Sequence, residues 1–165
     1  SALLRQDPDV VLLQEVRTPD EVKEFVDLGI KGHLAYSTMH TGSVQETILR
    51  LLGVSDEPKI LKETIKLIVT QELIGKKCPV CKGIKSETKC EHCNGLGVKG
   101  LLPVYEMAYF KDIDNMDITD MKSIVKSGQV DYISKKEIAR EYKALDLILD
   151  RDYNRIMEYE KDLRE

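Results

Sequence analysis

Residues 7–17 read Asp7-Pro8-Asp9-Val10-Val11-Leu12-Leu13-Gln14-Glu15-Val16-Arg17, and this segment indicates the fold class. Its four consecutive branched aliphatic residues predict a strand that is covered on both faces, as in parallel α/β sheets. Thr18-Pro19-Asp20-Glu21 follows as a capping box and predicts a helix to about Ile30. Residues 33–40 form the next predicted strand. Because a strand, a helix and a strand with short connections normally make a right-handed parallel crossover, we predict an α/β fold.

The rest of the chain is predicted to be mainly helical, with one further strand region. Capping boxes, apolar periodicity and glycines set the expected limits of these elements. The predicted elements are a helix over residues 43–52, an amphipathic helix from Pro58 to about Ile74, a strand or hairpin arm over residues 101–110, a short helix capped by Asp117 or Thr119, and a longer helix that starts at Ser134.

The composition indicates a soluble, globular protein. The 165 residues are 42% hydrophobic and 33% charged, unlike a disordered chain. A formal charge of -4 argues against extensive nucleic-acid binding, because that function usually requires a basic surface. No apolar stretch approaches membrane-spanning length, and the first residues lack the pattern of a signal segment. Together with reduced cysteines at metal-ligand spacing, these features predict a cytoplasmic location.

All four cysteines lie in the pattern Cys78-x2-Cys81-x8-Cys90-x2-Cys93. Two such knuckles can close one tetrahedral thiolate cage, and zinc suits a soft ligand set of this kind. Two disulfides are the alternative interpretation. A closed zinc site stabilises a small fold and rarely performs catalysis, so the function has to be sought elsewhere in the chain.

Glu15 stands at the downstream end of the first predicted strand, where ligands of open α/β sheets gather. If the two strands are parallel neighbours, His40 and Thr41 reach the same edge. A carboxylate, an imidazole and a hydroxyl there can position a water and sense a phosphate. Asp9 lies about 20 Å from Glu15 at 3.3 Å per residue, and His33 is likewise at the far end of its strand. On spacing alone, a solvated acid and a structural histidine are the alternatives.

Several segments of the sequence together resemble one protein family. Residues 4–17 resemble the Walker B segment of the type II secretion and type IV pilus assembly ATPases, and residues 32–41 are similar to their histidine box. Residues 71–106, with the four cysteines and the run Gly95-x-Gly97-x-x-Gly100, match the order in which that family passes from its ATPase core into a tetracysteine metal domain. The resemblance covers about the first two thirds of the chain.

The resemblance implies a RecA-like P-loop ATPase that uses ATP and Mg²⁺ and works as a homohexamer. It would power the assembly of pilin or pseudopilin fibres from the cytoplasmic side of the inner membrane. The implied partners are an inner-membrane platform protein and other pilus or secretion components, without nucleic acid. Carried over by position, Glu15 would orient or activate the attacking water and His40 would lie nearest the terminal phosphate. The implied nucleotide-binding residues are His33, Thr41 and Arg17, and the implied zinc ligands are Cys78, Cys81, Cys90 and Cys93.

The resemblance also implies three parts of the chain. Residues 1–75 would be the distal half of the RecA-like core, residues 76–107 the zinc-binding module, and residues 108–165 a helical C-terminal region. No segment reads G-x-x-x-x-G-K-[ST], the loop that holds ATP phosphates. Because this loop lies upstream of Walker B in the family, we expect a C-terminal portion of a longer ATPase, and we expect this portion alone to be inactive.

The sequence departs from the family pattern at a few positions. Gln14 replaces the glycine that commonly precedes the catalytic acid, and Glu72 and Leu101 replace arginines. The eight residues between the cysteine pairs are few for the family. These departures indicate a divergent member.

Two other functions compete with the ATPase interpretation. Residues 90–97 form the repeat C-x-x-C-x-G-x-G, which resembles the cysteine-rich region of Hsp40 chaperones, although that region uses four repeats. A nucleic-acid-binding zinc ribbon is the second alternative, but no aromatic residue interleaves with its lysines. We predict that Glu106 is structural and that His92 is exposed and is not a ligand. The lysines of the ribbon alternative are Lys76, Lys77, Lys82, Lys85, Lys89 and Lys99.

Overall fold

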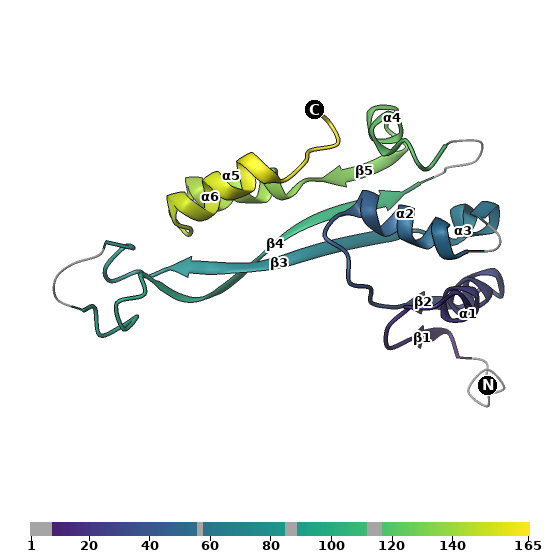
Figure 1. Cartoon of the computed structure of the whole chain (residues 1–165), viewed down its shortest axis with the longest axis horizontal. Helices are drawn as coiled ribbons and strands as arrows, with labels where there is room; N and C mark the ends of the chain where they lie inside the picture. The colour runs from purple at the N-terminus through teal and green to yellow at the C-terminus, as the bar shows by residue number, and fades with distance from the viewer. Residues whose placement is uncertain (1–7, 56–57, 85–88, 112–116) are drawn as a thin grey trace. The chain divides into compact units, whose positions relative to one another are not determined.

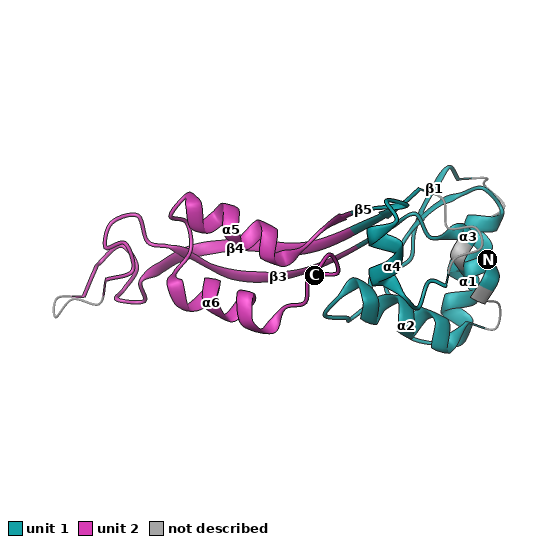
Figure 2. Cartoon of the chain, turned by 90° about the horizontal axis from the view of Figure 1, so that it is seen from above, with its two compact units in different colours: residues 1–68, 108–131 teal, residues 69–107, 132–165 magenta. Residues whose placement is uncertain are grey.

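The computed structural model describes residues 8–55, 58–84, 89–111 and 117–165 of the chain (Figure 1). Their contacts divide the chain into two compact units (Figure 2). Unit 1 comprises residues 1–68 and 108–131, and unit 2 comprises residues 69–107 and 132–165. The three functional parts predicted from the sequence (residues 1–75, 76–107 and 108–165) have other bounds than these two units, and they stay a prediction.

Unit 1 contains the predicted strand–helix–strand segment. Strands β1 and β2 pair in parallel, with Val10 opposite Leu34, which confirms the predicted pairing. The second strand is shorter than the predicted 33–40, since it covers Leu34–Tyr36. The first strand is not covered on both faces as predicted, because Val10 and Leu12 are exposed by 56% and 75%. The helices and strands of this segment are β1 (Val10–Leu12), α1 (Pro19–Ile30), β2 (Leu34–Tyr36), α2 (Val44–Val54) and α3 (Pro58–Thr64).

Helix α1 begins as the sequence predicts. The Thr18 hydroxyl accepts from the Glu21 amide, and the Glu21 carboxylate accepts from the Thr18 amide, so the capping box is complete. Val22 and Val26 on one face of α1 are buried. The helix packs against β2, α2 and α3, and so holds the parallel strand pair on one side.

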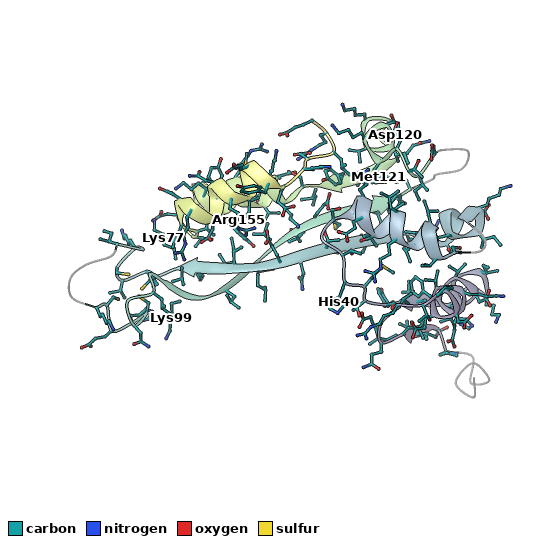
Figure 3. All side chains as sticks on the ribbon, viewed as in Figure 1. His40, Lys77, Lys99, Asp120, Met121 and Arg155 are labelled. Atoms are coloured by element: carbon teal, nitrogen blue, oxygen red, sulfur yellow. The ribbon has the colours of Figure 1, made fainter. Side chains whose placement is uncertain are left out.

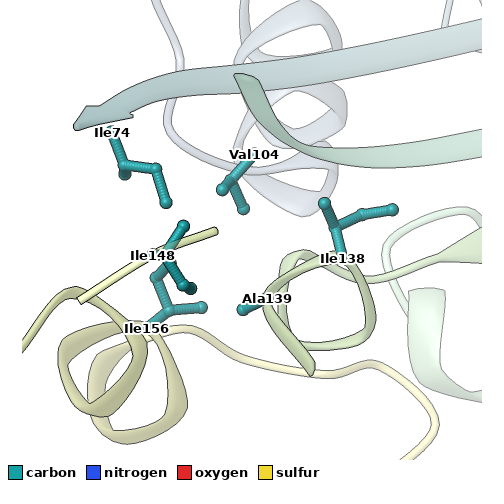
Figure 4. Close-up of a cluster of buried hydrophobic side chains, with 6 residues drawn as sticks. All are labelled: Ile74, Val104, Ile138, Ala139, Ile148 and Ile156. Atoms are coloured by element: carbon teal, nitrogen blue, oxygen red, sulfur yellow. The ribbon is translucent and has the colours of Figure 1, made fainter. Parts of the chain in front are cut away.

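Strands β3 (Leu67–Lys77), β4 (Val98–Phe110) and β5 (Val130–Ile133) form a second sheet in the order β3-β4-β5. Within unit 2, helices α5 (Lys135–Ala144) and α6 (Asp150–Tyr159) pack on each other. Branched aliphatic side chains fill the core between these helices and strands (Figure 4). That core comprises Ile74, Val104, Ile138, Ala139, Ile148 and Ile156.

The predicted helix from Pro58 to about Ile74 is wrong after its first seven residues, since α3 ends at Thr64 and β3 follows. Burial alternates along β3: Ile68 and Ile74 are buried, and Val69 between them is half exposed. This period of two is that of a strand with one covered face. The separation of six residues between Ile68 and Ile74 fits the period of two and not one face of a helix, and pairing with β4 fixes this segment as a strand.

The C-terminal region is less continuously helical than predicted. Helix α4 (Met121–Lys126) is capped by Asp120 and not by the predicted Asp117 or Thr119, and strand β5 follows it. Ser134 caps α5 as predicted, but α5 stops at Ala144 because Asp146 has a left-handed φ of 56°. A second helix, α6, follows and buries Ile156. Among the described residues, no helix is long and apolar enough to span a membrane.

Candidate functional site

The parallel pairing brings the ends of β1 and β2 to one edge of their sheet. Hydrogen bonding continues beyond the strands, because the Val16 amide donates to the Thr38 carbonyl at 3.0 Å and the Thr38 hydroxyl donates to the Gln14 carbonyl at 2.7 Å. These bonds fix the backbone on both sides of Glu15. Gln14, the departure from the family pattern, thus has its carbonyl engaged within this ladder.

Glu15 and His40 face each other at this edge. His40 Nε2 lies 3.5 Å from Glu15 Oε1, so the predicted juxtaposition is confirmed. The Glu15 side chain is 19% exposed, and that of His40 is 86% exposed. His40 lies on the loop between β2 and α2 (Figure 3). At this separation the carboxylate and the imidazole contact each other directly, and a water lying beside the pair can hydrogen-bond to both.

Arg17 completes the cluster from the other side. Its guanidinium donates a hydrogen bond to Glu15 Oε2, and its backbone amide donates to Glu21 at the start of α1. The Arg17 hydrogen bond holds the pKa of Glu15 below its ordinary value, although partial desolvation opposes this shift. Glu15 is therefore ionised at neutral pH.

Two other predicted site residues contact the scaffold. His33 lies at the far end of β2, where its Nδ1 is 2.8 Å from the Pro8 carbonyl oxygen, so it is not part of the Glu15–His40 cluster. Thr41 follows His40 but its hydroxyl lies 2.6 Å from that of Thr47 on α2.

Sequence patterns gave no sign of Arg50, which contacts the same loop. Its Nη1 atom donates to the His40 carbonyl at 2.8 Å. The Ser43 hydroxyl caps α2 and marks where the helix starts, but it does not show which way Arg50 faces. An arginine in the second turn of a helix carries no motif of its own, which is why the sequence did not reveal this contact.

The four cysteines form a second candidate site. Their sulfur atoms all lie within 4.8 Å of one another, and Cys81 Sγ is 3.7 Å from Cys93 Sγ. A tetrahedral zinc with bonds of about 2.3 Å requires sulfurs about 3.8 Å apart, so the cluster fits this ion. All four cysteines are free thiols, contrary to the disulfide alternative. His92 is exposed and lies outside the cluster, as predicted.

Backbone turns shape both knuckles in the same way. A left-handed residue pair follows each C-x-x-C, with Lys82 and Gly83 in the first knuckle and Asn94 and Gly95 in the second. Gly83 is required for close packing as well, because a Cβ there would lie 2.2 Å from Leu149 Cδ2. These turns direct the backbone around the sulfurs.

The protonation states of the thiols differ within the cluster. Burial raises the pKa of Cys81 to about 11. Burial also opposes ionisation of Cys93, but the Gly97 amide, which donates to Cys93 Sγ at 3.3 Å, and the neighbouring thiols lower the Cys93 pKa to about 7. Since metals bind thiolates, an ion would have to deprotonate Cys81 on binding.

Two carboxylates of the sheet serve the scaffold. Glu106 is buried and accepts hydrogen bonds from Tyr132 at 2.6 Å and Thr70 at 3.4 Å, so it links the three strands. This agrees with its predicted structural role. Glu72, which departs from the family pattern, accepts a hydrogen bond from Arg155 of α6 at 3.1 Å. The reversed charge therefore has a partner within unit 2.

Comparisons with known proteins place the chain in a family. The family model described as Type II/IV secretion system protein matches residues 1–149. The chain is 30% identical over 135 residues to the type IV pilus assembly ATPase PilB of Myxococcus xanthus, covering 67% of this chain and 24% of the relative. It is 28% identical over 166 residues to the type II secretion system protein E of Klebsiella pneumoniae, covering 87% and 33%.

The solved structure of the Legionella pneumophila ATPase DotB superposes with a TM-score of 0.74 at 19% identity, over 97% of this chain and 42% of that chain, which shows a common fold. The chain spans a quarter to a third of the length of the two curated relatives. The α/β fold is therefore that of secretion ATPases. Because the family model matches most of its residues, the chain belongs to the type II/IV secretion system protein family.

Proposed function

We propose that this chain is the part of a hexameric secretion-type ATPase that contains the Walker B acid, the histidine box and a zinc module. The full-length protein would hydrolyse ATP with Mg²⁺ in the cytoplasm, peripheral to the inner membrane, and drive type IV pilus assembly or type II secretion. The observation that carries the proposal is the 3.5 Å approach of His40 Nε2 to Glu15 Oε1 at the shared edge of two parallel strands. Family membership supports the reaction class.

In the proposed site, Glu15 accepts a hydrogen bond from the attacking water and aligns it with the terminal phosphate. His40, which is largely exposed beside it, contacts the phosphate. Arg17 keeps the Glu15 carboxylate ionised and oriented. Phosphoryl transfer needs little covalent chemistry from the protein, so alignment and charge supply most of the rate. Thr41 and His33 would act through the loop and the strand that carry them.

The four cysteines would hold a structural zinc ion. The ion would fold the knuckles, and its closed thiolate shell leaves no open position for chemistry. We retain the three functional parts proposed from the sequence: a distal RecA-like core over residues 1–75, the zinc module over 76–107, and a C-terminal region over 108–165. An inner-membrane platform protein and further pilus or secretion components would be the partners.

The test uses the full-length protein with Glu15→Gln. This variant keeps the shape of the side chain but removes its charge, and we expect kcat to fall by about 10²–10⁴-fold. Lys23→Met on α1, which removes an exposed cation away from the site, is the control. Wild-type turnover in Glu15→Gln, or no ATPase activity in the wild-type protein, would favour a zinc-knuckle binding module that lacks ATPase activity.

A further inference from the structure

The loop that carries His40 is fastened to α2 through successive residues. Arg50 donates from Nη1 to the His40 carbonyl oxygen at 2.8 Å. The hydroxyls of Thr41 and Thr47 lie 2.6 Å apart, and Thr47 is buried. Because these contacts reach two adjacent residues of the loop, α2 determines where its backbone lies.

The next residue of the loop is bound in the same way. The Gly42 amide donates to Glu46 Oε2 at 2.8 Å, and the Ser43 hydroxyl accepts from the Glu46 amide at 3.1 Å. The Glu46 carboxylate thus binds the amide of Gly42 and not that of Ser43, the N-cap residue of α2. Residues 40, 41 and 42 all have a side-chain partner on one helix, so the loop is held along its length.

Helix α2 is a rigid support for these contacts. Val44, Ile48 and Leu51 on its inner face are buried, with exposed fractions of 0%, 1% and 6%. The helix packs against α1 and α3, and α1 also packs against β2. The position of Arg50 is therefore fixed relative to the parallel strands that carry Glu15.

Packing does not fix His40 itself. Its side chain is 86% exposed, so few neighbouring atoms restrict where the imidazole lies. Apart from its own contact with Glu15, the imidazole is placed by the backbone of the loop and by the contacts of that backbone. Among the described residues, Arg50 donates a side-chain hydrogen bond directly to the His40 backbone.

We propose that Arg50 is a positioning residue that holds His40 against Glu15 through the His40 carbonyl. The proposal rests on the proposed function, in which Glu15 and His40 act on the water and the phosphate. A misplacement of about 1 Å in such a site can cost about 10²-fold in rate. The Arg50 contact restrains the His40 backbone because a hydrogen bond from a charged donor is stronger than one between neutral groups.

The experiment measures kcat and KM of the full-length ATPase with Arg50→Met, which keeps a long side chain but removes the donors. We expect kcat to fall about 10–100-fold with KM within about threefold of wild type, because the chemical geometry is lost and nucleotide binding is not. Arg50→Lys keeps one donor and should recover part of kcat. Lys23→Met should leave both constants unchanged.

A double-mutant comparison identifies the route of the effect. If Arg50 acts through His40, Arg50→Met will cause no further loss in a His40→Ala background. A further loss of similar size in that background would overturn the proposal, since Arg50 would then act directly on the nucleotide or on the fold. Unchanged kcat in Arg50→Met would also overturn it.

Two further measurements keep the test decisive. If Arg50→Met lowers the melting temperature, Arg50→Gln, which retains polarity but is shorter, is compared in the same two backgrounds and judged by the same outcomes. Glu15→Gln is measured in parallel. Loss of activity in Glu15→Gln with no effect of Arg50 substitutions rejects the positioning role alone, whereas full activity in Glu15→Gln rejects the proposed function.

Discussion

Removal of the metal from the four-cysteine cluster is expected to unfold the knuckles and to leave the β1–β2 pair folded. The knuckles have little apolar core of their own, because Val80, Ile84 and Leu96 are exposed by 66%, 69% and 69%. The sulfurs converge within 4.8 Å, so the ion would take the place of that core. Without the ion, the four thiols and a few backbone turns are too little to keep the knuckles folded.

The size of the effect follows from the energy of structural zinc sites. Zinc binding contributes about 10–16 kcal/mol in small zinc domains, which is of the same order as the total stability of a typical domain, about 5–15 kcal/mol. With the metal bound, the knuckle amides should exchange their hydrogens only when the surrounding unit opens. Even a loss of about 4 kcal/mol of this protection corresponds to about 10³-fold faster exchange.

Hydrogen exchange of the full-length protein before and after chelation measures this loss. The reporters are residues 78–84 and 89–97, which include the Gly97 amide bonded to Cys93, and residues 10–16 are the internal reference. Cys81→Ser should resemble the chelated protein, and His92→Ala should retain the metal. Unchanged exchange over the knuckles in a sample shown to be free of zinc would refute the reasoning.

Two other predictions concern the site and the core. Arg17→Met removes the hydrogen bond that lowers the Glu15 pKa, so the Glu15 pKa should rise. Because Glu15 must be ionised to act, the loss of kcat on acidification should then move to higher pH. A pH–rate profile of the full-length protein checks this direction. Ile156→Ala in the unit 2 core should cost about 2–5 kcal/mol in urea unfolding, whereas Leu145→Ala at an exposed position should cost about 0.5 kcal/mol or less.

The parallel unit was predictable because its local signals are strong and agree with one another. The Thr18–Glu21 capping box starts α1 without help from tertiary contacts, and an aliphatic run on either side of a helix leaves little choice of topology. The pairing then brings Glu15 and the loop that carries His40 to the same edge of the sheet. The cysteine cluster was predictable for a similar reason, since its ligands lie close together in the sequence.

The second sheet was less predictable because its signals are tertiary. The sequence does not mark the end of α3 before β3 begins, and the pairing with β4 fixes β3 as a strand. The break between α5 and α6 depends on one left-handed residue, Asp146. The contact from Arg50 to the His40 carbonyl involves a backbone atom, which leaves no pattern in the sequence.

The ionisation of Glu15 bears on how the proposed site would work. A general base is most effective with a pKa near the working pH, and the Arg17 hydrogen bond moves the Glu15 pKa away from that range. A carboxylate with a lowered pKa is a weak base but a dependable acceptor, so it suits the alignment of a water better than the removal of its proton. The same arginine restricts the orientation of the carboxylate, and Arg50 restricts that of the histidine loop. Both arginines would therefore serve alignment, which is the main contribution that a protein makes to phosphoryl transfer.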